Sequence, residues 1–325
     1  MTAPPPAARS AEPPVVIDDV VKHYGEVAAV DHVTIEVRQG ELFGFIGPDG
    51  AGKTTLFRIL TTLLLPDAGS ARVLGLDVVS GIWSLRRQIG YMPGRFSLYP
   101  DLSVRENLDF FASVFGTTIA REYDQIAPIY SQLEPFNDRR AAALSGGMKQ
   151  KLALCCALVH RPRILFLDEP TTGVDAVSRR EFWELLARMR TSGLTIVVST
   201  PYMDEANRCD RVALMQSGRI LATDAPAAVA ASFDRTLLAV RSGDRYRTLL
   251  ALRGYPHTHL VYPFGDALHL ADDRVGVDAA HAATDAAAFL RDKGFADARV
   301  EATPPTIEDV FIARMSVVEP PEAAA

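Results

Sequence analysis

The sequence predicts an α/β protein with a mainly parallel sheet covered by helices, followed by a small α+β domain. Continuous apolar runs at Leu42–Ile46, Ile164–Leu167 and Thr195–Ser199 are separated by segments of helical spacing. Strands that alternate with helices imply a parallel sheet buried on both faces. After residue 226 the composition and the spacing of apolar residues change, which indicates a second domain.

Length, composition and charge agree with this organisation and exclude several function classes. A chain of 325 residues favours about two domains, and 48% hydrophobic residues are ample for a packed core. Lys and Arg number 34 against 40 Asp and Glu, for a net charge of −6, which argues against nucleic acid as the main partner. No apolar run is long enough to span a membrane.

The cysteines and the two ends of the chain carry no predicted chemistry. Cys155, Cys156 and Cys209 lack metal-ligand spacing, and the adjacent pair Cys155 and Cys156 lies in an apolar run, so we expect this pair to pack in the core of a protein from a reducing compartment. Residues 1–14 are rich in Pro and Ala without the apolar segment of a signal peptide. We expect residues 1–14 and 317–325 to be disordered tails.

The first domain begins with two predicted strands, Val15–Val21 and Val33–Val37, joined by a turn at Tyr24-Gly25. The apolar strand Leu42–Ile46 follows, and a helical pattern from Thr55 to Leu65 is closed by Pro66. The remaining predicted helical segments are 104–115, 122–133, 151–159, 178–190 and 204–207, with a further strand at 89–93.

Residues 47–54, with the sequence GPDGAGKT, match the phosphate-binding pattern G-x-x-x-x-G-K-[ST] between a predicted strand and a predicted helix. Backbone N–H groups at such a helix N-terminus cradle a polyphosphate. Lys53 would reach the β- and γ-phosphates, and the Thr54 hydroxyl would ligate Mg²⁺. A chance match in a chain of this length is roughly one in a hundred. The predicted nucleotide-binding residues here are Gly47, Asp49, Gly50, Ala51, Gly52, Lys53, Thr54 and Thr55.

Two further motifs supply carboxylates and an open helix end. Asp168 and Glu169 follow an apolar strand, where Asp168 would bind Mg²⁺ with Thr54 and Glu169 would polarise an attacking water. Ser145 is a predicted N-cap, and Gly146 and Gly147 leave that helix N-terminus open to an anion.

The order of the phosphate loop, LSGGMKQ at 144–150, LFLDEP at 165–170 and GVD at 173–175 resembles the ATP-binding subunit of ABC transporters, over about residues 15–225. The resemblance implies a phosphate-loop ATPase fold with added antiparallel and helical subdomains, and ATP with Mg²⁺ as ligands. It implies a head-to-tail dimer, in which each nucleotide lies between one chain's phosphate loop and the other's LSGG segment. It also implies that Tyr24 stacks on adenine and that Asp175 contacts the partner.

The chain departs from that family at two positions near the γ-phosphate. Gly94 stands where the family has a glutamine that touches Mg²⁺ and the catalytic water, and Pro201 stands where it has a histidine. Proline offers neither a side-chain hydrogen bond nor a backbone N–H. We therefore expect strong ATP binding and weak hydrolysis in the chain's own site.

The second domain reads as β-α-β-β-α-β, the order of a ferredoxin-like module. Its predicted strands and helices are 236–241, 245–253, 258–262, 267–270, 279–293 and 298–302. A final helix is predicted after Thr306, with Asp309 in a capping-box-like contact. This region resembles the C-terminal extension of bacterial drug- and polyketide-efflux subunits. We place the domains at 15–227 and 235–316.

These features together predict an energy-coupling subunit of an exporter, peripheral at the cytoplasmic face of the plasma membrane. It would drive a separate integral-membrane permease, docked near Phe96, Leu98 and Tyr99, and pair with a second, preferably non-identical, ATP-binding domain. Two alternatives stay open: a soluble ABC protein acting on ribosomes or DNA, and a non-hydrolysing ATP-gated regulator. A homodimer in which other groups replace the missing glutamine and histidine is also open.

Overall fold

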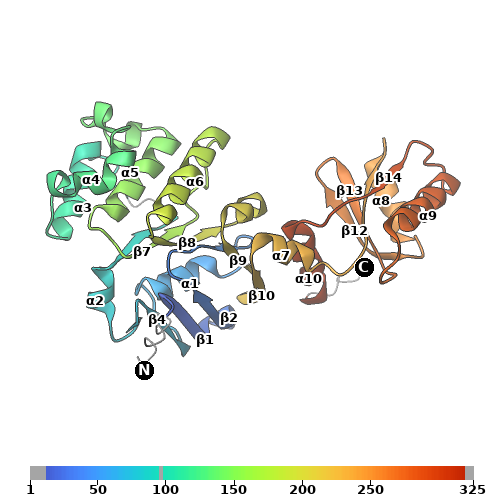
Figure 1. The fold of residues 1–325 in the computed structure, drawn as a ribbon, viewed down its shortest axis with the longest axis horizontal. Helices are drawn as coiled ribbons and strands as arrows, with labels where there is room; N and C mark the ends of the chain where they lie inside the picture. Colours follow the sequence, from blue (N-terminus) through green and yellow to red (C-terminus); the bar gives the residue numbers. More distant parts are fainter. Residues whose placement is uncertain (1–11, 95–97, 319–325) are drawn as a thin grey trace, which may run out of the picture. The chain divides into compact units, whose positions relative to one another are not determined.

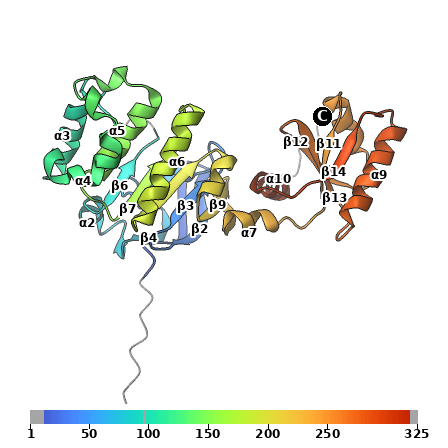
Figure 2. The same cartoon turned by 45° about the horizontal axis from the view of Figure 1, so that its top comes forward.

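The computed structural model describes residues 12–94 and 98–318, so Phe96 of the predicted docking segment and most of the two predicted tails lie outside the described residues. The chain divides into two compact units, residues 1–226 and 227–325, which are described separately. Figures 1 and 2 show the helices and strands of each unit. The proposed domain boundary within 228–234 falls on the end of helix α7 (Pro226–Ala231) and the segment after it.

A six-stranded sheet forms the centre of the first unit. Its strand order is β10-β9-β3-β8-β7-β6, with β10 antiparallel at one edge and the others parallel. The strands are β3 (Leu42–Ile46), β6 (Ile89–Met92), β7 (Ile164–Asp168), β8 (Thr195–Thr200), β9 (Arg211–Gln216) and β10 (Arg219–Asp224). Strands β3, β7 and β8 match the three predicted apolar strands, and all their residues are buried.

A second, antiparallel sheet has the order β2-β1-β4-β5. Its strands are β1 (Val15–Tyr24), β2 (Val27–Val37), β4 (Ala68–Val73) and β5 (Leu76–Asp77). The prediction of a strand ending at Val21 and another starting at Val33 was too short on both sides of the turn. Pairing of Tyr24 with Val27 leaves only Gly25 and Glu26 between the strands, and Gly25 has a positive φ of 60°.

Helix α1 (Lys53–Leu60) packs between the two sheets, where Phe57 lies edge-on to Phe45 and Phe166. The helix is shorter than the predicted segment that ended at Leu65. Thr62 has φ 65°, and this left-handed residue stops the helical path although the apolar spacing continues. The early end brings Leu63 to the wall of the nucleotide cleft described below.

A helical region follows β6 and contains α3 (Val104–Val114), α4 (Ile119–Tyr130) and α5 (Gly146–Leu158). The prediction placed α5 five residues too far along the chain at its start, because it counted the capping glycines outside the helix. The remaining helical elements are α2 (Ile82–Arg86), α6 (Ala176–Thr191) and short 3₁₀ turns at 134–136, 141–143 and 203–208. Cys155 and Cys156 are buried free thiols, as predicted, and Cys209 is buried as well.

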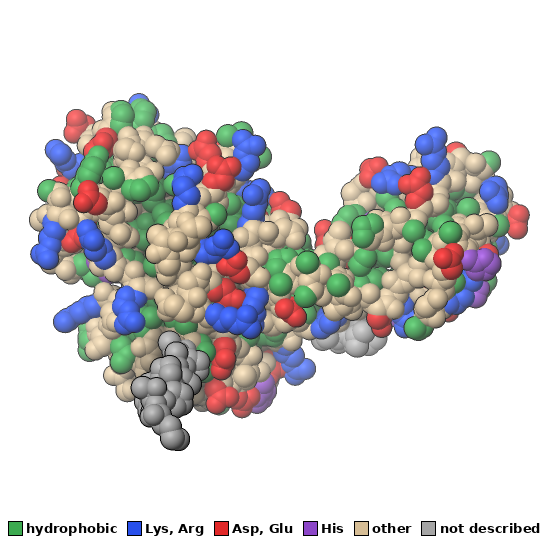
Figure 3. All heavy atoms as spheres, in the orientation of Figure 1, with side chains coloured by type: hydrophobic (Ala, Val, Ile, Leu, Met, Phe, Trp, Pro, Cys, Tyr) green, Lys and Arg blue, Asp and Glu red, His purple; other side chains and the backbone are tan. Residues whose placement is uncertain are grey.

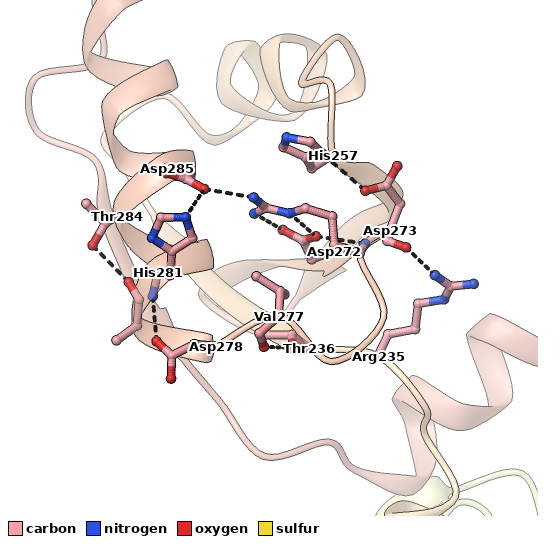
Figure 4. Close-up of polar contacts among 12 residues, drawn as sticks. Arg235, Thr236, His257, Asp272, Asp273, Val277, Asp278, His281, Thr284 and Asp285 are labelled. Atoms are coloured by element: carbon pink, nitrogen blue, oxygen red, sulfur yellow. Dashed lines mark hydrogen bonds and ion pairs between the residues drawn. The ribbon is translucent and has the colours of Figure 1, made fainter.

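The second unit has the ferredoxin-like arrangement predicted for it. Its antiparallel sheet has the order β12-β13-β11-β14, and α8 and α9 pack on one face. The elements are β11 (Leu237–Arg241), α8 (Arg245–Arg253), β12 (Thr258–Phe264), β13 (Ala267–Asp272), α9 (Ala279–Asp292) and β14 (Arg299–Ala302). In Figure 4, Asp272 and Asp285 lie close together, and both accept hydrogen bonds from Arg274, which ties β13 to α9.

The last helix, α10 (Ile307–Val318), is anchored to the sheet through Asp309. Asp309 is fully buried and accepts hydrogen bonds from Tyr262 on β12 and His269 on β13, each at 2.6 Å. Its other oxygen accepts the Thr306 backbone N–H at 2.7 Å, and the Thr306 hydroxyl accepts the Asp309 N–H at 3.4 Å. The predicted capping-box contact is therefore present, and the carboxylate also holds α10 to two strands.

Candidate nucleotide-binding site

One cleft of about 970 Å³ brings together most of the residues that the sequence singled out. It opens at the carboxyl ends of β3 and β7, where the polar groups that follow neighbouring parallel strands meet. Its lining includes Tyr24, Asp49, Gly50, Ala51, Gly52, Lys53, Thr54, Thr55, Asp168 and Glu169. Tyr24 is 49% exposed, so its ring is open to a flat ligand such as a base.

The glycines of the phosphate loop are required by close backbone contacts. Gly52 has φ 101°, and a Cβ atom there would lie 2.1 Å from the Ala29 carbonyl oxygen. A Cβ at Gly47 would lie 2.0 Å from the Met215 carbonyl oxygen. Only glycine fits such positions. The loop is thereby held against β2 and β9, and α1 begins immediately after Gly52 with its first N–H groups free of intrahelical partners.

The Lys53 ammonium group lies inside the loop. Nζ donates to the carbonyl oxygens of Gly47 at 2.7 Å and Pro48 at 2.9 Å, and lies 3.5 Å from Glu169 Oε1. Burial lowers the pKa of Lys53, while the neighbouring Glu169, Asp49 and Asp168 carboxylates act in the opposite direction. A buried cation with acidic neighbours at a helix N-terminus is suited to binding a polyanion.

The two predicted Mg²⁺ ligands lie next to each other. Thr54 Oγ1 is 3.2 Å from Asp168 Oδ1, and Asp168 is buried at the end of β7. The hydroxyl and carboxylate are oxygen donors of the kind that Mg²⁺ prefers, and they adjoin the loop that would hold phosphates. This pair therefore fits a Mg²⁺ ion that shares its coordination sphere with a nucleotide.

Glu169 follows directly, with its side chain 22% exposed at the cleft. Its φ of 51° is unusual for a residue with a side chain. The Glu169 N–H donates to both the backbone oxygen and the hydroxyl of Ser199, each at 3.0 Å. The carboxylate is thus directed by the backbone into the same cleft as Lys53.

Ser145, Gly146 and Gly147 do not line this cleft. Ser145 caps α5 as predicted, accepting the Met148 N–H at 3.3 Å. Gly147 is buried, and a Cβ there would lie 2.5 Å from Ser178 Oγ on α6. The prediction that both glycines keep the helix end open therefore describes only Gly146, because Gly147 is needed for contact between α5 and α6.

The two departures follow the carboxyl ends of strands β6 and β8. Gly94 is exposed and lines the cleft, and a Cβ there would lie 3.0 Å from the Asp168 carbonyl oxygen. Pro201 follows Thr200 at the end of β8, and Thr200 donates a hydrogen bond to the buried Glu205. No side chain at position 94 or 201 can therefore hydrogen-bond a water or a phosphate.

Sequence reasoning missed several residues of the site, among them Tyr91, Arg58 and Ser199. Tyr91 and Arg58 line the cleft, and Ser199 hydrogen-bonds Asp168. Burial, with the Asp168 charge as a smaller contribution, raises the pKa of Tyr91. Tyr91 lies in strand β6 and Arg58 in helix α1, and the apolar residues around them in the sequence gave no sign of a role in the site. A polar residue at the end of an otherwise apolar strand was the signal available for Ser199.

An apolar groove of about 440 Å³ lies between α2, β6, α3 and α5. Trp83, 75% exposed, and Val114, 62% exposed, both line it, and Phe115 stacks on His160 with ring centroids 3.7 Å apart. Arg86 and Arg87 also line it. Tyr99, from the predicted docking segment, packs on Phe110 and on Phe111 of the groove, whereas Leu98 lines a different pocket.

Comparison with known proteins gives consistent matches to one family. The family model described as ABC transporter matches residues 30–172. A probable multidrug ABC transporter ATP-binding protein of Escherichia coli, YbhF, is 43% identical over 210 residues, which are 64% of this chain and 36% of that protein. The Nod factor export ATP-binding protein I of Paraburkholderia xenovorans is 41% identical over 224 residues, 68% of this chain and 74% of that protein.

Solved structures agree with the sequence matches. The chain resembles cbiO1 of Clostridium perfringens, part of the ABC transporter complex cbiONQ, with a TM-score of 0.61 and 26% identity over 68% of this chain and 92% of that one. It also resembles an ATP-binding cassette, MJ0796, described as a post-hydrolysis dimer bound to ADP and Pi. That match has a TM-score of 0.59 and 26% identity over 65% of this chain and 98% of that one.

Among the described residues, no helix combines the length and the apolar character needed to cross a bilayer.

Proposed function

Because this chain belongs to the ABC transporter ATP-binding family, whose ATP-binding domains are ATPases, we propose that it is the energy-coupling subunit of an exporter. ATP binding would close a dimer of cassettes and drive a separate permease from the cytoplasmic face of the membrane. The observation that carries this proposal is the convergence of Lys53, Thr54, Asp168 and Glu169 on one cleft. The exporter names of the relatives support the direction of transport.

Each of these residues of the cleft would have a distinct role in binding the nucleotide or in its hydrolysis. The phosphate loop and Lys53 would bind and orient the β- and γ-phosphates, and Tyr24 would hold the base. Thr54 and Asp168 would hold Mg²⁺, which when bound neutralises charge on the phosphate oxygens. Glu169 would accept a proton from the attacking water, since its carboxylate lies 3.5 Å from the cation that marks the phosphate position.

We further propose that hydrolysis in the chain's own site is weak. Gly94 and Pro201 present no side-chain group that can hold the water or contact the γ-phosphate, whereas the loop that binds the nucleotide is complete. A second cassette with an intact site, completed by the Ser145 segment of this chain, would then supply most of the ATPase activity. The same two positions also favour a second candidate function, an ATP-gated regulator that does not hydrolyse.

The apolar groove is the surface we propose for the permease. Its width, its aromatic walls and its exposed Trp83 suit an amphipathic helix laid between α2 and α3. Tyr99 extends the same surface through its contact with Phe111. On the face drawn in Figure 3, basic and acidic side chains are intermixed rather than gathered into the basic patch expected of a nucleic-acid-binding protein.

Copurification with a multi-span permease tests this function. The permease encoded nearest to this chain should copurify with the parent protein, and Val114→Asp should abolish the association by placing a charge in the groove. Val275→Asp is the matched control, because Val275 is also an exposed valine but lies in the C-terminal unit. Association with ribosomes or DNA in place of a membrane protein would contradict the proposal.

A further inference from the structure

Ser199 occupies a central place among the strands that carry the site. It lies near the end of β8, which pairs on one side with β3, the strand before the phosphate loop, and on the other with β7, which ends in Asp168. In the sheet register Ser199 is opposite both Phe45 and Asp168. The side chain is completely buried. It is therefore the residue of β8 that faces the junction between the loop and the two carboxylates.

The Ser199 hydroxyl group bridges the two acidic residues. It donates to Asp168 Oδ1 at 2.5 Å, and it accepts the Glu169 backbone N–H at 3.0 Å. The same Asp168 oxygen accepts the Thr54 hydroxyl at 3.2 Å. A hydrogen bond from a buried donor to a carboxylate is charge-assisted and about twice as strong as a neutral one. One hydroxyl thus fixes both the orientation of Asp168 and the peptide that begins Glu169.

Both acidic residues need such support. Glu169 has a left-handed backbone, which is unfavourable for a residue with a Cβ and persists only where its surroundings hold it. Asp168 must present its carboxylate toward Thr54 although its side chain could rotate. Gly94 and Pro201 stand in place of the family's glutamine and histidine, so fewer side chains surround these two acidic residues.

We propose that Ser199 is a positioning residue for the Mg²⁺-nucleotide site, acting through Asp168 and Glu169. The inference rests on the proposed function, because it assigns Ser199 a role in the binding of Mg²⁺ with ATP. Ser199 touches neither ligand in this role. It holds Asp168 where it can share a cation with Thr54, and it holds Glu169 in the backbone conformation that directs its carboxylate into the cleft.

Thr195, at the other end of β8, provides the contrast. It is also completely buried, and its hydroxyl accepts the Gly40 N–H at 2.9 Å. Gly40 lies in the turn before β3 and carries no group of the site. Loss of the Thr195 hydroxyl therefore removes a buried hydrogen bond of the same strand without reaching either acidic residue. A purely structural role for Ser199 predicts the same behaviour for both positions.

The experiment measures ATP affinity by titration calorimetry, with Mg²⁺ and with EDTA, for the parent, Ser199→Ala and Thr195→Val. Removal of a group that orients a metal ligand typically costs 10- to 100-fold in metal affinity or activity. We expect Ser199→Ala to weaken binding of ATP by roughly 10-fold or more with Mg²⁺, and to leave its binding in EDTA unchanged. Thr195→Val should match the parent in both conditions.

Two results would overturn the proposal: unchanged Mg²⁺-ATP affinity in Ser199→Ala, or an equal loss with Mg²⁺ and with EDTA. A parent chain that binds no nucleotide would instead contradict the proposed function itself. If Ser199→Ala fails to fold by circular dichroism, Ser199→Thr and Ser199→Cys replace it. Threonine keeps the donor and should retain the Mg²⁺ effect, whereas cysteine is a weak donor and should lose it. Parent-like Mg²⁺ dependence in Ser199→Cys would count against the role.

Discussion

Lys53 and Glu169 form an ion pair within the nucleotide cleft, with Nζ 3.5 Å from Oε1. The same ammonium group donates to the carbonyl oxygens of Gly47 and Pro48. The carbonyl oxygens of the loop and the Glu169 carboxylate therefore surround the cation. A bound phosphate would compete with Glu169 for Lys53.

Lys53→Ala should weaken ATP binding with Mg²⁺ roughly 10- to 100-fold, because it removes a charge-assisted hydrogen bond to the phosphates. Folding should be retained, because Lys53 is itself a buried cation. Its removal leaves Glu169 without this ion pair, but the Glu169 side chain is partly exposed to solvent. Titration calorimetry measures the affinity and circular dichroism checks the fold. Equal affinity in the parent and the variant would rule out the assigned loop.

Glu169→Gln should cost little of the ATPase rate of the assembled transporter, because Gly94 and Pro201 leave the water at this site poorly held. Ser145→Arg should be severe, since it places a long side chain where the partner's γ-phosphate would lie. Removing an effective catalytic base typically costs about 10²- to 10⁴-fold, so steady-state rates separate the two outcomes clearly. Robust activity of the purified chain alone, abolished by Glu169→Gln, would support a homodimer instead.

Deletion of residues 235–325 should leave ATP binding intact and weaken assembly or closure of the dimer. The cleft is lined only by residues of the first unit, and the second unit has its own core around Leu238, Leu268 and Leu290. Calorimetric titration measures binding, and sedimentation with ATP measures dimer formation. A truncated protein that folds but no longer binds nucleotide would show that the division between the units is misplaced.

Gly147→Ala should destabilise the packing of α5 on α6, because the added Cβ would meet Ser178 Oγ at 2.5 Å and its Cβ at 2.8 Å. Overpacking of this kind typically costs about 1–3 kcal/mol. Ser178→Gly in the same chain should recover much of the loss, which thermal unfolding can measure. Gly146→Ala is the control, since the nearest atom to its Cβ lies 3.5 Å away. Failure of Ser178→Gly to rescue would place the cause elsewhere.

Asp309 should make the C-terminal unit sensitive to acid. Burial raises the pKa of Asp309, but hydrogen bonds from His269, Tyr262 and Thr306 outweigh it and hold the pKa below its usual value. A carboxyl with a lowered pKa in the folded state stabilises above its unfolded pKa of about 3.9. That stabilisation is lost as pH falls through the folded pKa.

Calorimetry of the full chain tests this, following the transition that the 235–325 deletion removes. Asp309→Ala should lower the stability of that transition by about 1–3 kcal/mol at pH 7, because Tyr262 and His269 lose a buried partner. Below pH 4 the difference between the parent and the variant should shrink. Glu301→Ala is the control, because Glu301 is an exposed carboxylate of the same unit. A difference that stays constant with pH would exclude Asp309 as the titrating group.

Local sequence determined much of this protein. Residues 47–54 fix a strand, a glycine turn and a helix start within one short segment, so the phosphate loop is readable without tertiary contacts. The same holds for Ser145 as an N-cap and for the Thr306–Asp309 capping box, because each joins residues three positions apart. The two departures from the family, Gly94 and Pro201, can likewise be recognised from the sequence alone, because the motifs around them fix their positions.

The tertiary structure alone decided which distant groups share a site. Strand order brings Ser199 between the phosphate loop and Asp168, and no local pattern encodes that order, because pairing of parallel strands depends on how their buried faces pack. Packing also places Gly147 in contact with Ser178, which the sequence did not indicate. It gives Asp309 its hydrogen-bond partners on β12 and β13. Residue types and spacing therefore specified the chemistry, while long-range packing specified the groups that hold it in place.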